Sequence, residues 1–279
     1  MNRYARPQSL DEAIHLLAET GGSVLAGGTD FYPSLGDRPV EGSVVDISRI
    51  REMKGVTATA DEIRIGGLTT WSELLASSLP RCYDALKSAA REIGGVQIQN
   101  RGTVAGNLCN ASPAADSVPA LLALDAEVEL MSRSGKRRLA LAEFILGNRK
   151  TQRRQDEILT AVIVPREMDD AVSVFLKLGA RHYLVISIVM VAAVVKARSG
   201  RVKEARIAVG ACSARAQRLT GLEQELRGMA ASRGIGAMVR SEHLAALSPI
   251  DDVRATASYR REAALTLVAR ALDECMGNG

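Results

Sequence analysis

Hydrophobic and polar positions follow two different periods near the start of the chain. Residues 9–12 (Ser-Leu-Asp-Glu) form a capping box, and the apolar residues after them recur at helical spacing until Gly21, which predicts a helix. Residues 24–26 and 44–47 are short apolar runs typical of buried strands. Gly27 and Gly28 follow the first run, so the expected order is helix, strand, glycine turn, loop and strand.

The middle of the chain contains further short apolar segments separated by turn signals. Strands are predicted over residues 56–59, 63–65, 126–131 and 158–164. A second capping box at residues 70–73 and a helical pattern over residues 83–93 predict helices among these strands. The last strand closes at Pro165, and we expect the first domain to end near residue 168.

The final third of the chain separates strands from helices. Two long apolar stretches, residues 172–178 and 186–197, are followed by a turn and a strand over residues 205–211, which predicts a three-stranded antiparallel sheet. The remainder is helical in pattern, over residues 219–226, 235–247 and 256–275. This segregation indicates an α+β fold.

Length and composition favour two ordinary globular domains. The 279 residues exceed the roughly 100–200 of a single domain, and the apolar fraction of 47% is near the globular average. The longest apolar run, residues 184–195, is interrupted by Ser187 and is shorter than the ~20 residues of a membrane span. The first residues lack the apolar stretch of a signal peptide, so a cytoplasmic location is expected.

Cysteine, histidine and aromatic content argues against metal and nucleic-acid chemistry on this chain. The four cysteines contain no C-x-x-C pair and the three histidines have no metal-ligand spacing, so we expect packed thiols and surface or capping histidines. The net charge of +4 would suit nucleic acid, but aromatic residues are only 3% and no groove-binding motif occurs. An anionic ligand or an acidic partner explains the charge better.

Residues 26–30 (Ala-Gly-Gly-Thr-Asp) lie where a predicted strand ends. Glycine lacks the Cβ that would keep a phosphate away from backbone N–H groups, and Thr29 adds a hydroxyl donor. A Gly-Gly turn between elements is more often purely structural, so this segment alone leaves both interpretations open.

Residues 103–116 (Thr-Val-Ala-Gly-Asn-Leu-Cys-Asn-Ala-Ser-Pro-Ala-Ala-Asp) form a second segment of small residues and polar donors. Such a mixture suits a dinucleotide pyrophosphate. Asp116 is suited to accept a hydrogen bond from a sugar or ribitol hydroxyl, and the alternative is that it caps a helix beginning near Ser117. Neither segment is the glycine motif of a Rossmann fold or of a nucleoside triphosphatase.

Together the two segments resemble the FAD-binding motifs in the flavoprotein subunits of the xanthine dehydrogenase and carbon monoxide dehydrogenase family of molybdenum hydroxylases. The likeness continues through residues 175–181, 205–211 and 251–261, and so covers nearly the whole chain. It implies an FAD-binding domain of the p-cresol methylhydroxylase and vanillyl-alcohol oxidase type over residues 1–168, with α+β subdomains at about 1–52 and 53–168. A small C-terminal flavoprotein domain would cover residues 169–279.

The resemblance also implies which residues hold FAD. One set would surround the pyrophosphate and the flavin side: Val24, Leu25, Ala26, Gly27, Gly28, Thr29, Asp30 and Phe31. A second set would form the opposite wall: Thr103, Val104, Ala105, Gly106 and Asn107. Asp116 would hold a hydroxyl of FAD, Leu159 would make an apolar contact near a ring, and Lys177 would add a positive charge. For Lys177 the alternative is an exposed strand lysine.

By the same resemblance, the chain would relay electrons and contain no catalytic side chain. Electrons taken from substrate at a molybdopterin centre of a large partner subunit would cross 2Fe–2S clusters of another partner, reach this FAD singly, and leave as a pair to NAD, a quinone or oxygen. A heterotrimer or its dimer is expected. The alternatives are a self-sufficient flavin oxidase or reductase of the same fold, and a non-enzymatic assembly or nucleotide-sensing module.

Four other features qualify this interpretation. Ala105 stands where the family's second motif usually has a glycine, and its methyl fits only if the residue does not need a positive φ. The basic run at residues 149–154 is expected to be a solvated loop, with a docking patch or phosphate-attracting rim as the alternative. Residues 251–261 are expected to anchor the final helix, and Tyr183 is expected to pack within a strand.

Overall fold

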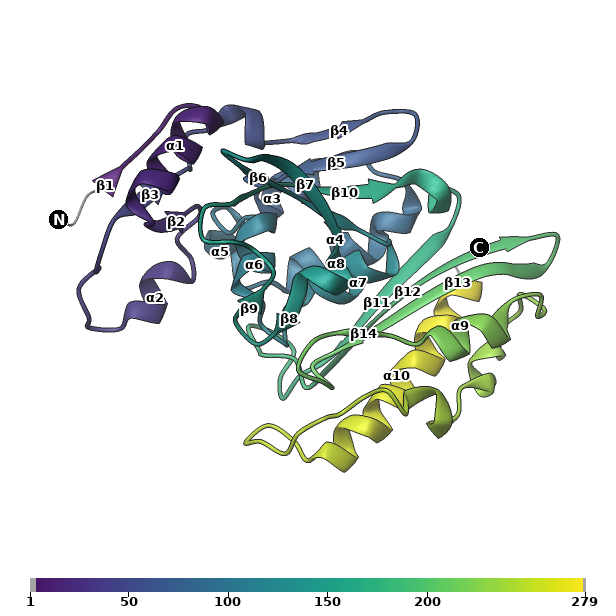
Figure 1. The fold of residues 1–279 in the computed structure, drawn as a ribbon. Coiled ribbons are helices and arrows are strands. Elements are labelled where there is room, and N and C mark those ends of the chain that lie inside the picture. Colours follow the sequence, from purple (N-terminus) through teal and green to yellow (C-terminus); the bar gives the residue numbers. More distant parts are fainter. Residues whose placement is uncertain (1–3, 278–279) are drawn as a thin grey trace.

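The computed structural model describes residues 4–277, and a small parallel sheet covered by one helix opens the fold (Figure 1). The strands lie in the order β1 (Tyr4–Ala5), β3 (Val44–Asp46) and β2 (Ser23–Leu25). The helix α1 (Leu10–Thr20) begins after Ser9, whose side chain accepts a hydrogen bond from the Glu12 N–H, and ends at Gly21 with φ 59°. The capping pattern therefore predicted both ends of α1 correctly.

A five-stranded antiparallel sheet forms the centre of the molecule. Its order is β4 (Val56–Ala58), β5 (Glu62–Gly66), β10 (Ile158–Pro165), β6 (Glu127–Ser132) and β7 (Gly135–Ala140). Helix α2 (Phe31–Leu35) lies between β2 and β3 in the chain. Helices and a short hairpin complete the central region: α3 (Trp71–Ala76), α4 (Asp84–Glu92), α5 (Val96–Gln99), α6 (Val104–Asn110), α7 (Ser117–Ala123), α8 (Leu141–Phe144), β8 (Ile145–Gly147) and β9 (Lys150–Thr151). The apolar side chains of α3, α4, α6 and α7 pack with those of the sheet in one core.

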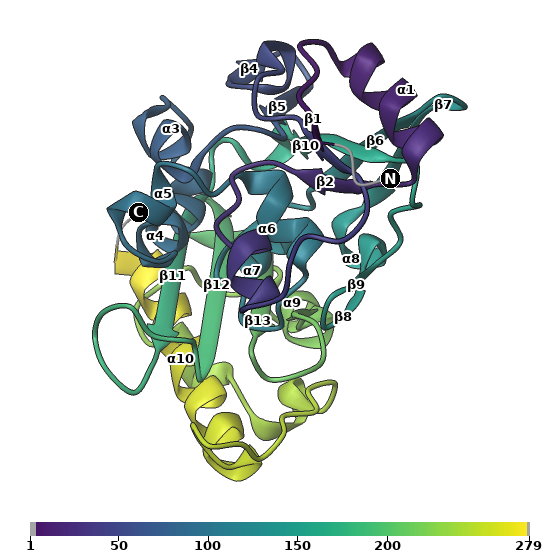
Figure 2. The ribbon, with the colours of Figure 1, turned by 90° about the vertical axis from the view of Figure 1, so that its left-hand side faces the viewer.

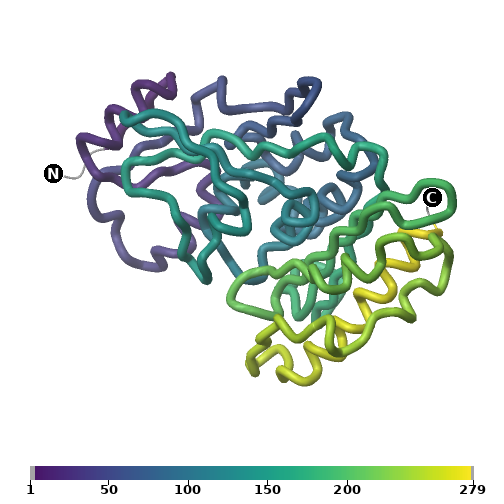
Figure 3. The backbone as a smooth tube through the Cα atoms, turned by 45° about the vertical axis from the view of Figure 1, so that its right-hand side comes forward, coloured from purple at the N-terminus to yellow at the C-terminus, as the bar shows by residue number. Residues whose placement is uncertain are grey.

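The C-terminal sheet lies between two helical layers. Its order is β11 (Val172–Leu178), β12 (Val189–Arg198), β13 (Arg201–Gly210) and β14 (Gln217–Arg218). Ala192, Val194 and Ala208 pack into the core that contains α4 and α7, whereas alternate residues pack against α9 (Thr220–Leu226) and α10 (Ala257–Gly277). Figure 2 shows β11 and β12 beside α10, and Figure 3 shows the chain passing from the small parallel sheet at one end to α10 at the other.

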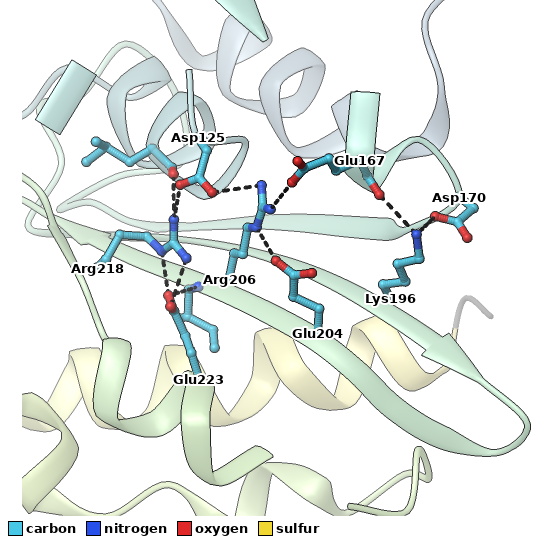
Figure 4. A network of polar contacts seen from close by, with 10 residues as sticks. Asp125, Glu167, Asp170, Lys196, Glu204, Arg206, Arg218 and Glu223 are labelled. Atoms are coloured by element: carbon cyan, nitrogen blue, oxygen red, sulfur yellow. Dashed lines mark hydrogen bonds and ion pairs between the residues drawn. The ribbon is translucent and has the colours of Figure 1, made fainter. Parts of the chain in front are cut away.

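An ion-pair seam joins β13 to the preceding part of the chain (Figure 4). We define it by Asp125, Glu167, Arg206 and Arg218. Arg206 is 4% exposed and lies 3.0 Å from Asp125 and 3.3 Å from Glu167, while Arg218 lies 2.5 Å from the other oxygen of Asp125. Since all three carboxylate contacts cross from one sheet region to the other, the seam holds the C-terminal sheet in place.

The predicted α+β fold is confirmed, with two local differences. The C-terminal sheet has the three expected long strands and gains the two-residue strand β14. The helix predicted over residues 235–247 is wrong, because this segment forms two 3-10 helices, Ile235–Met238 and Ser241–Leu244. Arg240 between them is extended, and its N–H donates to Nδ1 of His243 instead of to a helical carbonyl. The remaining 3-10 helices are Arg51–Met53, Arg81–Tyr83 and Arg166–Met168.

Candidate functional site

The two glycine-containing segments lie against each other. A Cβ added to Gly27, just after β2, would lie 1.9 Å from the carbonyl oxygen of Arg101. A Cβ added to Gly102 would lie 3.4 Å from Oγ1 of Thr29. Only glycine permits the first of these approaches, so the missing side chain of Gly27 brings residues 26–30 and 101–116 together.

The first segment leaves backbone donors free. Gly28 has φ +76°, a left-handed conformation that favours glycine. Within residues 4–277, the N–H groups of Gly27, Gly28 and Thr29 donate no hydrogen bond, whereas the carbonyl of Gly28 accepts one from Tyr32. Consecutive N–H groups without partners form a concave donor array that attracts anions. The turn therefore has the properties of a phosphate cradle.

The second segment begins as a short helix. Thr103 precedes α6, and its hydroxyl accepts a hydrogen bond from the Gly106 N–H at 3.1 Å. Ala105 lies inside α6 without a positive φ, and its N–H donates to the carbonyl of Gly67 at 3.1 Å. The methyl of Ala105 therefore meets the condition set from the sequence and does not distort the segment.

Asp116 forms the charged end of the second segment. Its Oδ2 lies 2.7 Å from Nζ of Lys177, and its Oδ1 accepts a hydrogen bond from the hydroxyl of Ser187 at 2.6 Å. The side chains of Asp116 and Lys177 are each 8% exposed, so the prediction of an exposed strand lysine is wrong. Asp116 precedes α7, but its side chain makes no capping bond, so the alternative helix-cap role is wrong as well.

The electrostatics of Asp116 balance two opposed effects. Burial raises the pKa of Asp116 above its ordinary value, and this exceeds the lowering effect of the ion pair with Lys177. The carboxylate of Glu92, 3.9 Å from the same Nζ, raises it further. An ionised carboxylate has about four acceptor positions, so Asp116 can still accept from a ligand hydroxyl after binding Lys177 and Ser187.

Asn107 connects two helices of the site. Its Oδ1 accepts a hydrogen bond from the hydroxyl of Ser117 at 2.7 Å, and Ser117 follows Asp116 in the chain. This bond ties α6 to the start of α7 within the second segment. The N–H groups of the first segment lie beside Arg101 and Gly102, at one end of residues 101–116, and the carboxylate of Asp116 lies at the other end.

Other residues predicted for the site occupy varied positions. Val104 and Leu159 are buried in the core, at 0% and 3% exposure, and Leu25 is buried beside β3. The ring of Phe31 meets that of Tyr32 edge-on at 5.3 Å. Val24 and Ala26 are half-buried, and Asp30 is exposed. These contacts do not test the roles expected for these residues near FAD, which stay predictions.

The basic run touches the first segment. Arg149 is exposed and lies 3.5 Å from the carboxylate of Asp30, and its N–H donates to the carbonyl of Ala111 in the second segment. Arg153 donates inward to the carbonyl of Glu157 at 2.7 Å. The run is therefore partly tied to both segments and is not only a solvated loop.

Two polar residues at the site were missed from the sequence. Ser187 and Glu92 both lie in the group around Asp116 and Lys177. A signal for Ser187 was present, because it is the polar interruption of a long apolar run. The expectation for Tyr183 was wrong, since it lies outside the strands with 62% exposure and stacks on His182.

Comparison with known families assigns both halves of the chain. Residues 1–167 match the family model described as the FAD binding domain in molybdopterin dehydrogenase. The chain belongs to this family. Residues 175–275 of this flavoprotein match a second model, the CO dehydrogenase flavoprotein C-terminal domain. The resemblance inferred from the two glycine-containing segments is thereby confirmed.

Two curated relatives of the flavoprotein are named as FAD subunits of dehydrogenases. It is 31% identical over 280 residues to the xanthine dehydrogenase FAD-binding subunit of Escherichia coli O157:H7, covering 98% of this chain and 95% of that one. It is 35% identical over 194 residues to the nicotinate dehydrogenase FAD-subunit of Eubacterium barkeri, covering 67% of this chain and 66% of that subunit.

Solved structures show the same fold. The flavoprotein superposes on a chain of the carbon monoxide dehydrogenase of Hydrogenophaga pseudoflava with a TM-score of 0.89, at 27% identity and over 99% of this chain and 97% of that one. A chain of quinoline 2-oxidoreductase from Pseudomonas putida 86 matches with a TM-score of 0.91 at 24% identity, over 100% of this chain and 98% of that one.

Two features are absent from the described part of the flavoprotein. Within residues 4–277, no helix has both the length and the apolar character needed to cross a membrane. In the same residues, no cluster of three or more His, Cys, Asp or Glu side chains is arranged to hold a metal ion. The four cysteines are free, and Cys82, Cys212 and Cys275 are buried.

Proposed function

We propose that this flavoprotein binds FAD between its two glycine-containing segments and passes electrons from iron–sulfur clusters of a partner subunit to a terminal acceptor. The observation that carries the proposal is the contact of Gly27 with the Arg101 backbone, beside three consecutive N–H groups that have no partner among the described residues 4–277. This arrangement suits the pyrophosphate of a dinucleotide, because phosphate oxygens can approach a backbone that has no Cβ in the way.

The residues of the site have separable roles in this proposal. Gly27, Gly28 and Thr29 donate N–H groups to the pyrophosphate, with Val24, Leu25, Ala26, Asp30 and Phe31 shaping the same wall. Thr103, Val104, Ala105, Gly106 and Asn107 form the facing wall on and before α6. Asp116 accepts a hydroxyl, Lys177 supplies a positive charge, and Leu159 supplies an apolar surface near a ring.

The protein contributes position and electrostatics to the reaction. FAD supplies the ability to accept electrons singly and release them as a pair. Lys177 is held in place by Asp116, and that ion pair is almost fully shielded from water. A shielded charge acts more strongly on its surroundings than one in water, so Lys177 favours added negative charge close to it.

The partners follow from the relatives. Relatives of this chain include the medium chain of a carbon monoxide dehydrogenase and the medium subunit of nicotine 6-hydroxylase. We infer that this chain is likewise the medium subunit of a complex with an iron–sulfur subunit and a large molybdenum-cofactor subunit, assembled as a heterotrimer or its dimer. The terminal acceptor is NAD, a quinone or oxygen.

The test compares the complex with the isolated subunit. The co-expressed complex is mixed without oxygen with a panel of xanthine, nicotinate, caffeine, glyceraldehyde and carbon monoxide, and flavin absorbance is followed. We expect a substrate to bleach the flavin of the complex but not that of the isolated subunit, and re-oxidation by NAD, a quinone or oxygen then names the acceptor. Turnover of a substrate by the isolated subunit would overturn the relay and favour a self-sufficient oxidase.

A further inference from the structure

Arg260, near the start of α10, is a buried cation without an assigned role. It is 1% exposed, and its Nε has no hydrogen-bond partner in the part of the chain that the structure describes. Its Nη2 donates to Oδ1 of Asp252 at 2.7 Å, which balances the charge. Asp252 also accepts hydrogen bonds from the backbone and guanidinium of Arg254, and these contacts hold the pKa of Asp252 well below its usual range.

The other contacts of Arg260 lie at one end of the C-terminal sheet. Its Nη1 donates to the carbonyl of Ile188 at 2.6 Å and to that of Ala211 at 3.1 Å. Ile188 directly precedes β12, and Ala211 directly follows β13. One guanidinium group therefore fixes the start of one strand and the end of its neighbour.

The same sheet end touches the second glycine-containing segment twice. Ser187, which precedes Ile188, donates its hydroxyl to Asp116 at 2.6 Å. Ala211, which has φ 61°, donates its N–H to the carbonyl of Pro113 at 3.0 Å. Each strand end held by Arg260 thus holds one residue of the segment from 103 to 116.

We propose that Arg260, paired with Asp252, is a positioning residue for the FAD site, holding Ser187 and Ala211 so that Asp116 and Pro113 keep their places. This proposal rests on the proposed function, since it concerns how that site is held. It also gives a role to the charged residues at 251–261, which belong to the resemblance noted in the sequence. Through Arg260 and Asp252 they hold the strand ends that contact residues 103–116.

Arg260 can hold this region in place because its single side chain forms hydrogen bonds with two carbonyls and one carboxylate. If Arg260 is replaced by glutamine, the buried carbonyl of Ile188 and the partly buried carbonyl of Ala211 lose a charged donor, and unsatisfied buried groups are costly. The strand ends then relax, and Ser187 loses its fixed hydrogen bond to Asp116. That bond lowers the pKa of Asp116, so its loss raises this pKa. The effects of Lys177 and Glu92 on the same pKa stay unchanged.

The test uses Arg260→Gln and the milder Asp252→Asn, with Arg206→Gln as the matched control. Arg206 is likewise a buried arginine, in β13, but its carboxylate partners Asp125, Glu167 and Glu204 lie outside both glycine-containing segments. FAD affinity is measured across pH by quenching of flavin fluorescence, and thermal unfolding is measured without FAD. All variants are compared with the wild-type flavoprotein.

We expect both test variants to weaken FAD binding, by about tenfold for Arg260→Gln, and to move the midpoint of its pH dependence upward. The control should lower thermal stability and leave FAD affinity and the midpoint unchanged. Wild-type affinity and midpoint in Asp252→Asn and in Arg260→Gln, or an equal loss in the control, would overturn the positioning role. Failure of the wild-type protein to bind FAD would instead refute the proposed function.

Discussion

The approach of Gly27 to the Arg101 backbone allows a sharp test by a single methyl group. In Gly27→Ala the new Cβ would lie 1.9 Å from a carbonyl oxygen, whereas real Cβ atoms essentially never come within 3.0 Å of such an atom. The two segments must therefore separate by about 1 Å. Neither side is a flexible side-chain end that could rotate away, so the backbone itself must move.

The free-energy cost of the added methyl group can be estimated from overpacked protein cores. Inserting a methyl group into a closely packed region costs about 1–3 kcal/mol. If FAD binding requires the original approach, this strain reduces FAD affinity by about 5- to 150-fold, because roughly 1.4 kcal/mol corresponds to a factor of ten. If the strain is relieved only by opening the site, the free protein loses little stability while FAD affinity falls.

The assay is a fluorescence titration of FAD, together with urea unfolding of the FAD-free protein. The matched control is Gly221→Ala in α9, where an added Cβ meets nothing within 4 Å and φ is not positive. This control should bind FAD normally and gain up to about 1 kcal/mol, since alanine favours a helix. Wild-type FAD affinity in Gly27→Ala would refute the idea that this close approach builds the site.

Three further predictions concern buried charge and thiols. Asp116→Asn leaves Lys177 buried without its carboxylate and should lower the free energy of unfolding in urea by about 3 kcal/mol, while weakening FAD binding. Arg206→Gln should cost about as much stability in the same assay but leave FAD binding intact. Burial raises the pKa of Cys212 to about 11, so labelling of this thiol at pH 8 should be much slower in the native protein than in urea; equal rates would contradict its burial.

Local sequence signals predicted the elements whose ends are set by adjacent residues. The side chains of Ser9 and Thr70 cap α1 and α3 as expected. An N-cap depends only on one residue and on the backbone N–H three positions later, so the local sequence is sufficient to predict it. The segment at 235–247 failed for the opposite reason. Its apolar spacing is helical, but Gly236 lies so close to α10 that an added Cβ would be 2.3 Å from the carbonyl of Ala269. Tertiary contact overrode the local pattern.

The residues of the candidate site could be predicted from the sequence, but their long-range contacts could not. Gly27 and Asp116 were identified from the sequence, but nothing local indicates that Gly27 meets Arg101, or that Asp116 is held by Ser187, which precedes β12. Both contacts join segments more than 70 residues apart. The boundary expected near residue 168 and the roles of individual residues toward FAD stay predictions.

The central claim is that this chain binds FAD at the junction of its two glycine-containing segments. The most direct measurement is the visible spectrum of the purified subunit before and after incubation with FAD and removal of the excess. Flavin absorption bands retained by the wild type, and lost or much reduced in Gly27→Ala, are the predicted result. A wild-type protein that shows no flavin bands and takes up none would contradict the account.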